Sequence, residues 1–218
     1  MKISKQTLEV LKNFATINTN ILVREGNTLS TISTGKNIFA KAEVKESFPK
    51  EFAIYDLNSL LSLLTLMEDT DVEFGDESLV VTKGNSRFEY FYADPNIIVS
   101  APDKSIDVDN FFQFDLTKED VDMILKAAAI TAGPMLSVVG DNGEVVVSVG
   151  DPSTPKSNSF RQVIGNTDKT FDAKLAMENF KVIPGSYSVT LSQKKFMFLE
   201  SSKGDLKYWL ALERSSDI

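Results

Sequence analysis

One pattern of predicted secondary structure recurs four times along this chain, and it limits the folds open to it. The clearest copy runs from Phe52 to Tyr92, where "FAIYD" predicts a strand, "LNSLLSLLTLM" a helix, and "VEFGDESLVVTKGNSRFEYFYA" alternates through two glycine-containing turns. The same order is predicted over Met1–Val44, Phe112–Val149 and Phe171–Leu212. A strand-rich unit that repeats with one helix each time favours an α+β fold built from similar domains.

The helices are expected over Lys5–Ala15, over the leucine-rich segment after Asp56, over Thr117–Ile130, and over a short stretch that follows "FDAKL" and ends near Lys181. Asp56 and the Thr117–Asp120 pair provide N-cap chemistry at two of the helix starts. A short strand is also expected before the first helix. Each helix carries one apolar stripe, which predicts that its other face is exposed.

A segment without steady periodicity, Ala93 to Asn110, lies between the second and third units and holds two prolines. It reads as a connector between two domains, 1–108 and 109–218, each built from two units. A long loop inside a single domain is the alternative interpretation.

The composition excludes several kinds of site. The 218 residues include no cysteine and no histidine, so disulfides, zinc–thiolate sites and the commonest general base are absent. The N-terminal "MKISKQTLEV" lacks the apolar core of a signal peptide, and no segment suits a bilayer, so we expect a cytosolic protein without a membrane contact. The net charge of -8 argues against indiscriminate coating of nucleic acid, although it permits a local basic surface.

Lysines recur on the outer faces of three of the predicted helices. At 100° per residue they fall opposite the apolar stripes, whereas the second helix presents only Asn58, Ser59, Ser62 and Thr65. Such lysines can simply be solvated. All four arginines lie outside the helices, and lysine suits phosphate whereas arginine reads guanine, so these faces would contact a DNA backbone without reading sequence. The candidate DNA-facing residues are Lys5, Lys12, Lys118, Lys126, Lys174 and Lys181.

Three segments carry a family resemblance that covers nearly the whole chain. "MKISKQTLEVLKNFATIN", "FAIYDLNSLLSLL" and "YADPNIIVSAPDKSI", with "YWLALE" near the end, resemble the DNA polymerase sliding clamp of T-even-type tailed bacteriophages. The resemblance implies a DNA-clamp fold of two similar domains, with helices lining the inside of a ring and sheets outside. It also implies a homotrimer that encircles duplex DNA without sequence specificity and tethers the replicative DNA polymerase in viral DNA replication.

The same resemblance implies further partners and a location. A clamp-loader ATPase complex would open and close the ring, late-transcription factors would use it, and the protein would work in the host cell cytoplasm. By the resemblance, partner tail peptides would bind an apolar pocket beside the connector. The connector here holds an apolar "NIIV" run, which is either tucked into its own domain or open to a ligand. The connector residues proposed for this pocket are Ile97, Ile98, Val99 and Pro102, and family analogy adds Leu210 and Leu212 as the other wall.

Two other classes of protein were weighed. The carboxylates of Asp107, Asp109, Glu119 and Asp120 could hold magnesium in a metal-dependent phosphoryl-transfer enzyme, although acids are ordinary in a connector and in a first helical turn. A phosphate-binding loop is lacking, since "GNTDKT" at Gly165 has no second glycine. A β-rich virion structural protein would explain the repeats but not the lysines. We therefore expect a protein that is not an enzyme and has no cofactor or metal.

Overall fold

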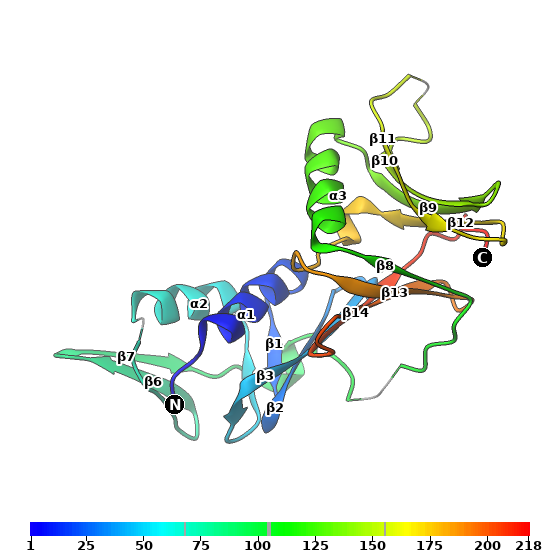
Figure 1. Ribbon diagram of the computed structural model, residues 1–218. Coiled ribbons are helices and arrows are strands. Elements are labelled where there is room, and N and C mark those ends of the chain that lie inside the picture. Colours follow the sequence, from blue (N-terminus) through cyan, green and yellow to red (C-terminus); the bar gives the residue numbers. More distant parts are fainter. Residues whose placement is uncertain (68, 104–105, 155) are drawn as a thin grey trace. The chain divides into compact units, whose positions relative to one another are not determined.

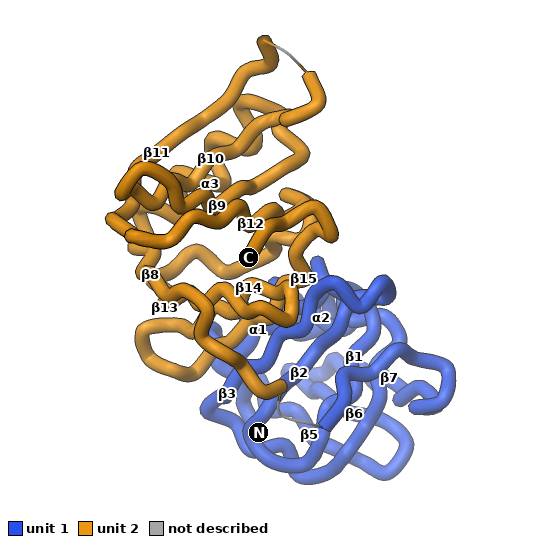
Figure 2. Tube along the Cα trace, turned by 90° about the vertical axis from the view of Figure 1, so that its right-hand side faces the viewer, with its two compact units in different colours: residues 1–104 blue, residues 105–218 orange. Residues whose placement is uncertain are grey.

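The computed structural model describes residues 1–67, 69–103, 106–154 and 156–218. The chain divides into two compact units, Met1–Lys104 and Ser105–Ile218, called unit 1 and unit 2 below (Figure 2). The division falls within the segment 93–110 that the sequence marks as a connector. Apart from one turn of 3-10 helix, Pro95–Ile97, the described part of that segment has no helix or extended strand.

In its described residues, unit 1 contains two α-helices and a set of antiparallel strands (Figure 1). Strand β1 pairs with β4, β2 pairs with β3, and β5, β6 and β7 follow one another in a meander. The elements are α1 (Lys5–Ile17), β1 (Ile21–Val23), β2 (Gly26–Ile32), β3 (Ile38–Phe48), β4 (Phe52–Ile54), α2 (Leu57–Leu66), β5 (Val72–Phe74), β6 (Ser78–Lys83) and β7 (Ser86–Phe91).

The core of unit 1 forms where α1 packs against α2 and β3. Helix α1 buries one stripe, which includes Val10, Leu11 and the fully buried Phe14. Strand β3 alternates strictly along its second half, with even-numbered residues buried and odd-numbered ones exposed. Helix α2 begins where the Asp56 carboxylate accepts a hydrogen bond from the Ser59 backbone N–H at 3.1 Å, as the sequence predicted.

Unit 2 contains one helix and eight strands in the part of it that the structure describes. One sheet has the order β11-β10-β9-β12, and a second ladder runs β8-β13-β14-β15, all antiparallel. The elements are β8 (Phe112–Leu116), α3 (Lys118–Thr131), β9 (Met135–Asp141), β10 (Glu144–Gly150), β11 (Phe160–Asn166), β12 (Phe171–Ala176), a 3-10 turn (Met177–Asn179), β13 (Tyr187–Ser192), β14 (Phe196–Ser201) and β15 (Leu206–Ala211).

Helix α3 packs on β10 and covers one face of its sheet. The predicted capping box is present, because Thr117 and Asp120 exchange side-chain and backbone hydrogen bonds at its start. Asp120 also accepts from the Gln162 side chain on β11 at 2.6 Å. On this covered face the Phe171 ring lies over Gly140, where a Cβ atom would come within 2.4 Å of the ring.

Two predicted elements are wrong. The last helix is a single 3-10 turn over Met177–Asn179, and the preceding "FDAKL" is strand β12 as predicted, with Phe171, Ala173 and Leu175 buried in alternation. Lys174 therefore lies on a strand. The short strand expected before α1 is not formed, although Met1 and Val72 exchange backbone hydrogen bonds at 2.8 Å.

Candidate DNA-facing helices and partner surface

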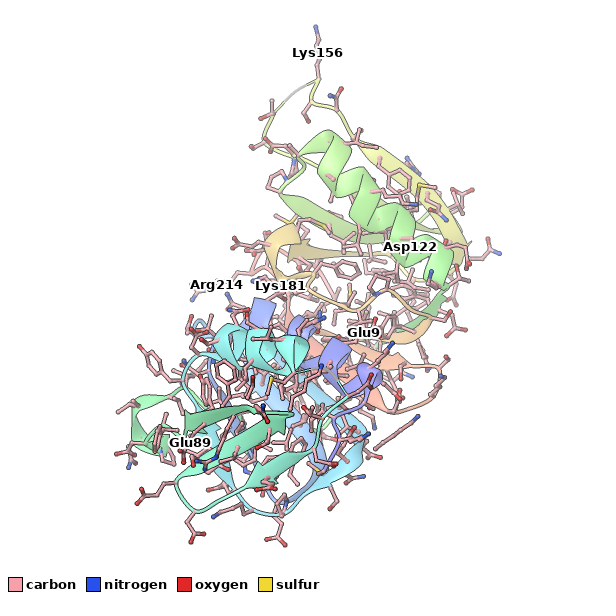
Figure 3. The ribbon with its side chains drawn as sticks, turned by 90° about the vertical axis from the view of Figure 1, so that its left-hand side faces the viewer. Glu9, Glu89, Asp122, Lys156, Lys181 and Arg214 are labelled. Atoms are coloured by element: carbon pink, nitrogen blue, oxygen red, sulfur yellow. The ribbon has the colours of Figure 1, made fainter. Side chains whose placement is uncertain are left out.

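The outer face of α1 carries both predicted lysines. Lys5 and Lys12 are exposed, opposite the buried stripe. Glu9, labelled in Figure 3, lies between them in sequence and is also exposed. The helix thus presents two cations and one carboxylate along its exposed face.

A buried carboxylate fixes the start of α1. Glu46 lies in the inward row of β3 with 8% of its surface exposed, and it accepts hydrogen bonds from the Ser4 backbone N–H and the Thr7 hydroxyl. Burial alone would raise the pKa of Glu46, but the hydrogen bonds from Thr7 and Ser4 hold that pKa below its usual value. The anion also faces the positive end of the helix dipole. Glu46 therefore positions the turn of α1 that carries Lys5.

Helix α2 presents hydroxyls rather than charges. A shallow open groove runs along α2 beside α1. It is lined by Lys12 of α1 and by Asn58, Leu61, Ser62, Thr65 and Leu66 of α2. The Ser62 hydroxyl donates to the Asn58 carbonyl and the Thr65 hydroxyl to the Leu61 carbonyl, each at 2.8 Å. These hydroxyl protons are already used within the helix, so α2 offers a polar surface without strong anion binding.

Helix α3 carries the other two helical lysines. Lys118 and Lys126 are exposed, and the Lys118 ammonium lies 3.2 Å from the Asp122 carboxylate one turn later. Figure 3 labels Asp122 on this helix. Met123 and Ile130 are also exposed on this helix, at 48% and 81%. The face is therefore partly apolar and only weakly basic, which suits loose contact more than tight binding.

The structure separates Lys174 from the helical lysines. Its ammonium pairs with the Asp172 carboxylate at 2.9 Å, and it is half-buried. Successive residues of a strand point to opposite faces, so Lys174 and Ala173 lie on opposite faces of β12. Cross-strand pairing through β9 and β10 places Ala173 on the same face of the sheet as Gln162. Gln162 contacts α3, so that face is the one covered by the helix. Lys174 thus lies on the other side of the sheet from α3. Lys181 is half-buried just after the 3-10 turn.

The predicted partner residues also divide. Ile97 and Val99 are 62% and 38% exposed, and Pro102 is exposed, whereas Ile98 is buried at 9%. Leu210 and Leu212 of unit 2 are buried, at 0% and 8%. Of the two alternatives left open for Ile97 and Val99, the structure has the exposed one, and Ile98 is the residue that packs inward. Leu210 and Leu212 cannot offer an open apolar wall, because they belong to the core of unit 2.

The comparisons with known proteins decide the family. Residues 3–100 match the family described as DNA polymerase processivity factor. The chain is 30% identical over 224 residues to the sliding clamp of Vibrio phage KVP40, covering 98% of this chain and 99% of that one. The chain belongs to the sliding clamp family. The sliding clamp of Enterobacteria phage T4 is 29% identical over 227 residues, covering 99% and 98% of the two chains.

Solved clamps share the fold at much lower identity. PCNA from A. fulgidus superposes with a TM-score of 0.70 at 13% identity, covering 96% of each chain. The DNA polymerase III beta chain from Streptococcus pneumoniae gives 0.69 at 12% identity, covering 96% of this chain and 63% of that one. The predicted clamp fold is therefore confirmed.

The clamp is not an enzyme, and three of the four carboxylates proposed as magnesium ligands, Asp107, Asp109 and Asp120, have structural roles. The Asp107 carboxylate pairs with Lys194 at 2.9 Å, and Asp109 accepts from the Ser192 hydroxyl and, at 2.8 Å, from the Gln193 N–H. These bonds hold the pKa of Asp109 below its usual value. No metal-binding group of acids was found among the described residues, and none of their helices is long and apolar enough to cross a membrane.

Sequence reasoning missed Glu46, although a signal existed. Glu46 occupies the apolar register of an alternating strand, between Val44 and Phe48. An acid at such a position is buried, and a buried acid needs donors.

Proposed function

We propose that three copies of this clamp close into a ring that encircles duplex DNA and tethers the replicative DNA polymerase of a phage. The full-length similarity to phage sliding clamps carries the proposal. We extend it to loading by a clamp-loader ATPase complex, to use by late-transcription factors, and to action in the host cell cytoplasm, as the resemblance implies.

Four lysines remain as the proposed DNA contacts: Lys5, Lys12, Lys118 and Lys126. All are exposed on helices and lie opposite buried stripes. Glu9 and Asp122 dilute their charge, and α2 adds only polar side chains. Weak, non-specific contacts with phosphate leave no deep energy minimum along the duplex, which suits sliding. Lys174 is withdrawn from the proposed DNA contacts because it lies on β12. Lys181, which follows the 3-10 turn, stays a fifth and untested prediction.

The ring would close through two strands whose outer edges are open. The free edge of β5 is covered by Met1, which bonds to Val72. The free edge of β12 is covered by the C-terminal tail, since Asp172 and Asp217 exchange backbone hydrogen bonds at 2.8 Å. Among the described strands of these two sheets, β7 and β11 remain at open edges. Exposed edges invite pairing.

Strands β7 and β11 also match in length and surface. They have six and seven residues, and β7 is exposed along almost its whole length. Phe88 of β7 is 44% exposed although its cross-strand partner Val81 is fully buried. Val163 of β11 is 51% exposed. Exposed apolar side chains on both edge strands would be buried if a second copy packed against them. We therefore place β7 of one subunit beside β11 of the next.

The partner surface is the exposed side of the connector, Ile97 and Val99, with the replicative polymerase's C-terminal peptide as its occupant. Ile97 and Val99 are exposed on either side of the buried Ile98, so the connector presents two apolar side chains to solvent. A few apolar anchors would supply most of the affinity. Because Ile98 is buried, a substitution there would damage unit 1, and Ile97 is the residue to change.

The test of DNA contact is a primer-extension assay with polymerase and loader. The variant K5A/K12A removes two exposed cations from α1, and K41A/K45A removes two exposed cations from the outward row of β3. We expect only the first to shorten the products and to make DNA binding less dependent on salt concentration, because counterion release scales with the number of phosphates contacted. Equal loss in both variants, or loss of the fold in the first, would count against these contacts.

A further inference from the structure

One buried polar side chain lies where α1, β2 and the connector meet. Asn18, the C-cap residue of α1, is only 5% exposed. Its amide nitrogen donates to the Ile32 carbonyl at 2.9 Å and to the Val99 carbonyl at 3.1 Å, and its oxygen accepts from the Asn20 N–H at 2.9 Å. Residues 81 apart in sequence are thus joined by one side chain.

A second side chain holds the connector two residues later. The Arg24 guanidinium donates to the Ala101 carbonyl at 2.9 Å, and Glu51 lies 3.9 Å from its Nε atom. Two side chains at these anchors pack inward, since Ile98, next to Val99, and Ala101 are 9% and 3% exposed. Both anchors bind backbone carbonyls, so they fix the path of the chain without contacting the exposed apolar side chains.

We propose that Asn18 and Arg24 are positioning residues, which order residues 98–101 on unit 1 and thereby present Ile97 and Val99 to the apolar anchors of the polymerase peptide. The inference rests on the partner site given under Proposed function. Without these two anchors, the connector would lose conformational entropy when a peptide binds, and that loss would weaken the affinity. Two backbone anchors supply the order beforehand.

The expected effect follows from the fraction of protein in the binding-competent state. The apparent dissociation constant rises in inverse proportion to that fraction, so a connector ordered one-tenth of the time binds about tenfold more weakly. Asn18→Ala removes the bond to Val99, and Arg24→Met removes the bond to Ala101 while keeping the aliphatic stem. Each is expected to weaken peptide binding by about tenfold.

Two control variants separate positioning from simple loss of stability. Glu51→Gln removes the carboxylate beside Arg24 but leaves the bond to Ala101 in place. Glu46→Gln destabilises the same unit at the start of α1, away from the Asn18 bonds. Both should retain wild-type peptide affinity.

The experiment is a titration of the polymerase's C-terminal peptide into each full-length variant, with methyl NMR of Ile98 as the second readout. We expect tenfold weaker binding, and an Ile98 methyl resonance that moves toward its solvent-exposed position, only in Asn18→Ala and Arg24→Met. Ile97→Asp tests the partner site separately, and full affinity there would refute that site. Loss of binding in Ile97→Asp together with full affinity in both anchor variants would overturn the positioning role alone.

Discussion

The contact between Glu46 and the start of α1 gives a prediction whose size can be estimated from the structure. Glu46 accepts two hydrogen bonds, from the Ser4 N–H and the Thr7 hydroxyl, in a buried setting. Glu46→Gln removes the charge and replaces one acceptor oxygen by an NH2 group that faces a donor. Hydrogen bonds to a charged group contribute about 1.5–3 kcal/mol each, and a charge at a helix terminus contributes up to about 2 kcal/mol. We therefore expect the substitution to lower the free energy of unfolding by about 2–4 kcal/mol at neutral pH.

The same substitution should change the pH dependence of stability. The folded-state pKa of Glu46 is lowered, so the unfolded chain binds the proton more readily and stability rises with pH. The contribution of Glu46 is complete above the unfolded-state pKa of about 4.3 and is lost as the pH falls through the lower folded-state pKa. The difference in free energy of unfolding between the wild type and Glu46→Gln should therefore become smaller below about pH 4.3.

Urea denaturation at several pH values, at one fixed protein concentration, measures this difference, because assembly makes stability depend on concentration. Glu43→Gln is the matched control, since Glu43 lies on the same strand but in the exposed row. It should change the free energy of unfolding by no more than about 0.5 kcal/mol. Equal losses in the two variants, or a Glu46→Gln loss that stays constant into acid, would refute the reasoning.

Three further predictions concern assembly, the partner surface and the core of unit 2. Phe88→Asp should reduce the solution mass toward the 24.1 kDa chain, whereas Ile130→Asp, an apolar-to-acid change at a more exposed position on α3, should keep the trimer; a trimer in both variants would remove β7 from the interface. Ile97→Asp should weaken binding of the polymerase peptide by tenfold or more, about 1.4 kcal/mol, in a calorimetric titration with the ring intact, and unchanged affinity would move the site elsewhere. Gly140→Ala should cost about 1–3 kcal/mol in urea denaturation, because the added Cβ meets the Phe171 ring, and a neutral result would mean that the ring can shift freely.

Much of the fold could be predicted because its signals are local. The stripes of α1, α2 and α3, the Asp56 cap and the Thr117–Asp120 capping box all lie within one or two helical turns. The last predicted helix failed because β12 stays paired with β9 as far as Ala176, which leaves seven residues before Pro184, and the residue before a proline disfavours helix. Lys174 was grouped with that helix because it lies seven residues before Lys181, although the segment "FDAKL" that contains it already predicted a strand.

The partner and anchor residues were harder to predict because their environment is built by distant segments. Nothing near Ile98 in the sequence distinguishes it from Ile97 and Val99, and the backbone beside it is held by Asn18 and Arg24, which precede it by more than seventy residues. Asn18 likewise reads as an ordinary helix end, since its bond to Val99 spans 81 residues. Leu210 carried a signal that was overlooked, because it alternates with the buried Tyr208 along β15.

Encirclement of DNA is the central claim, and DNA topology tests it most directly. The clamp would be loaded by its loader ATPase onto a nicked circular duplex, washed at high salt, and then exposed to a restriction enzyme that cuts the circle once. A closed ring held by topology should stay on the circle through the wash, because salt screens the weak lysine contacts but does not open the ring, and it should leave once ends are made. Loss from the intact circle at high salt, or equal retention after cutting, would contradict the account.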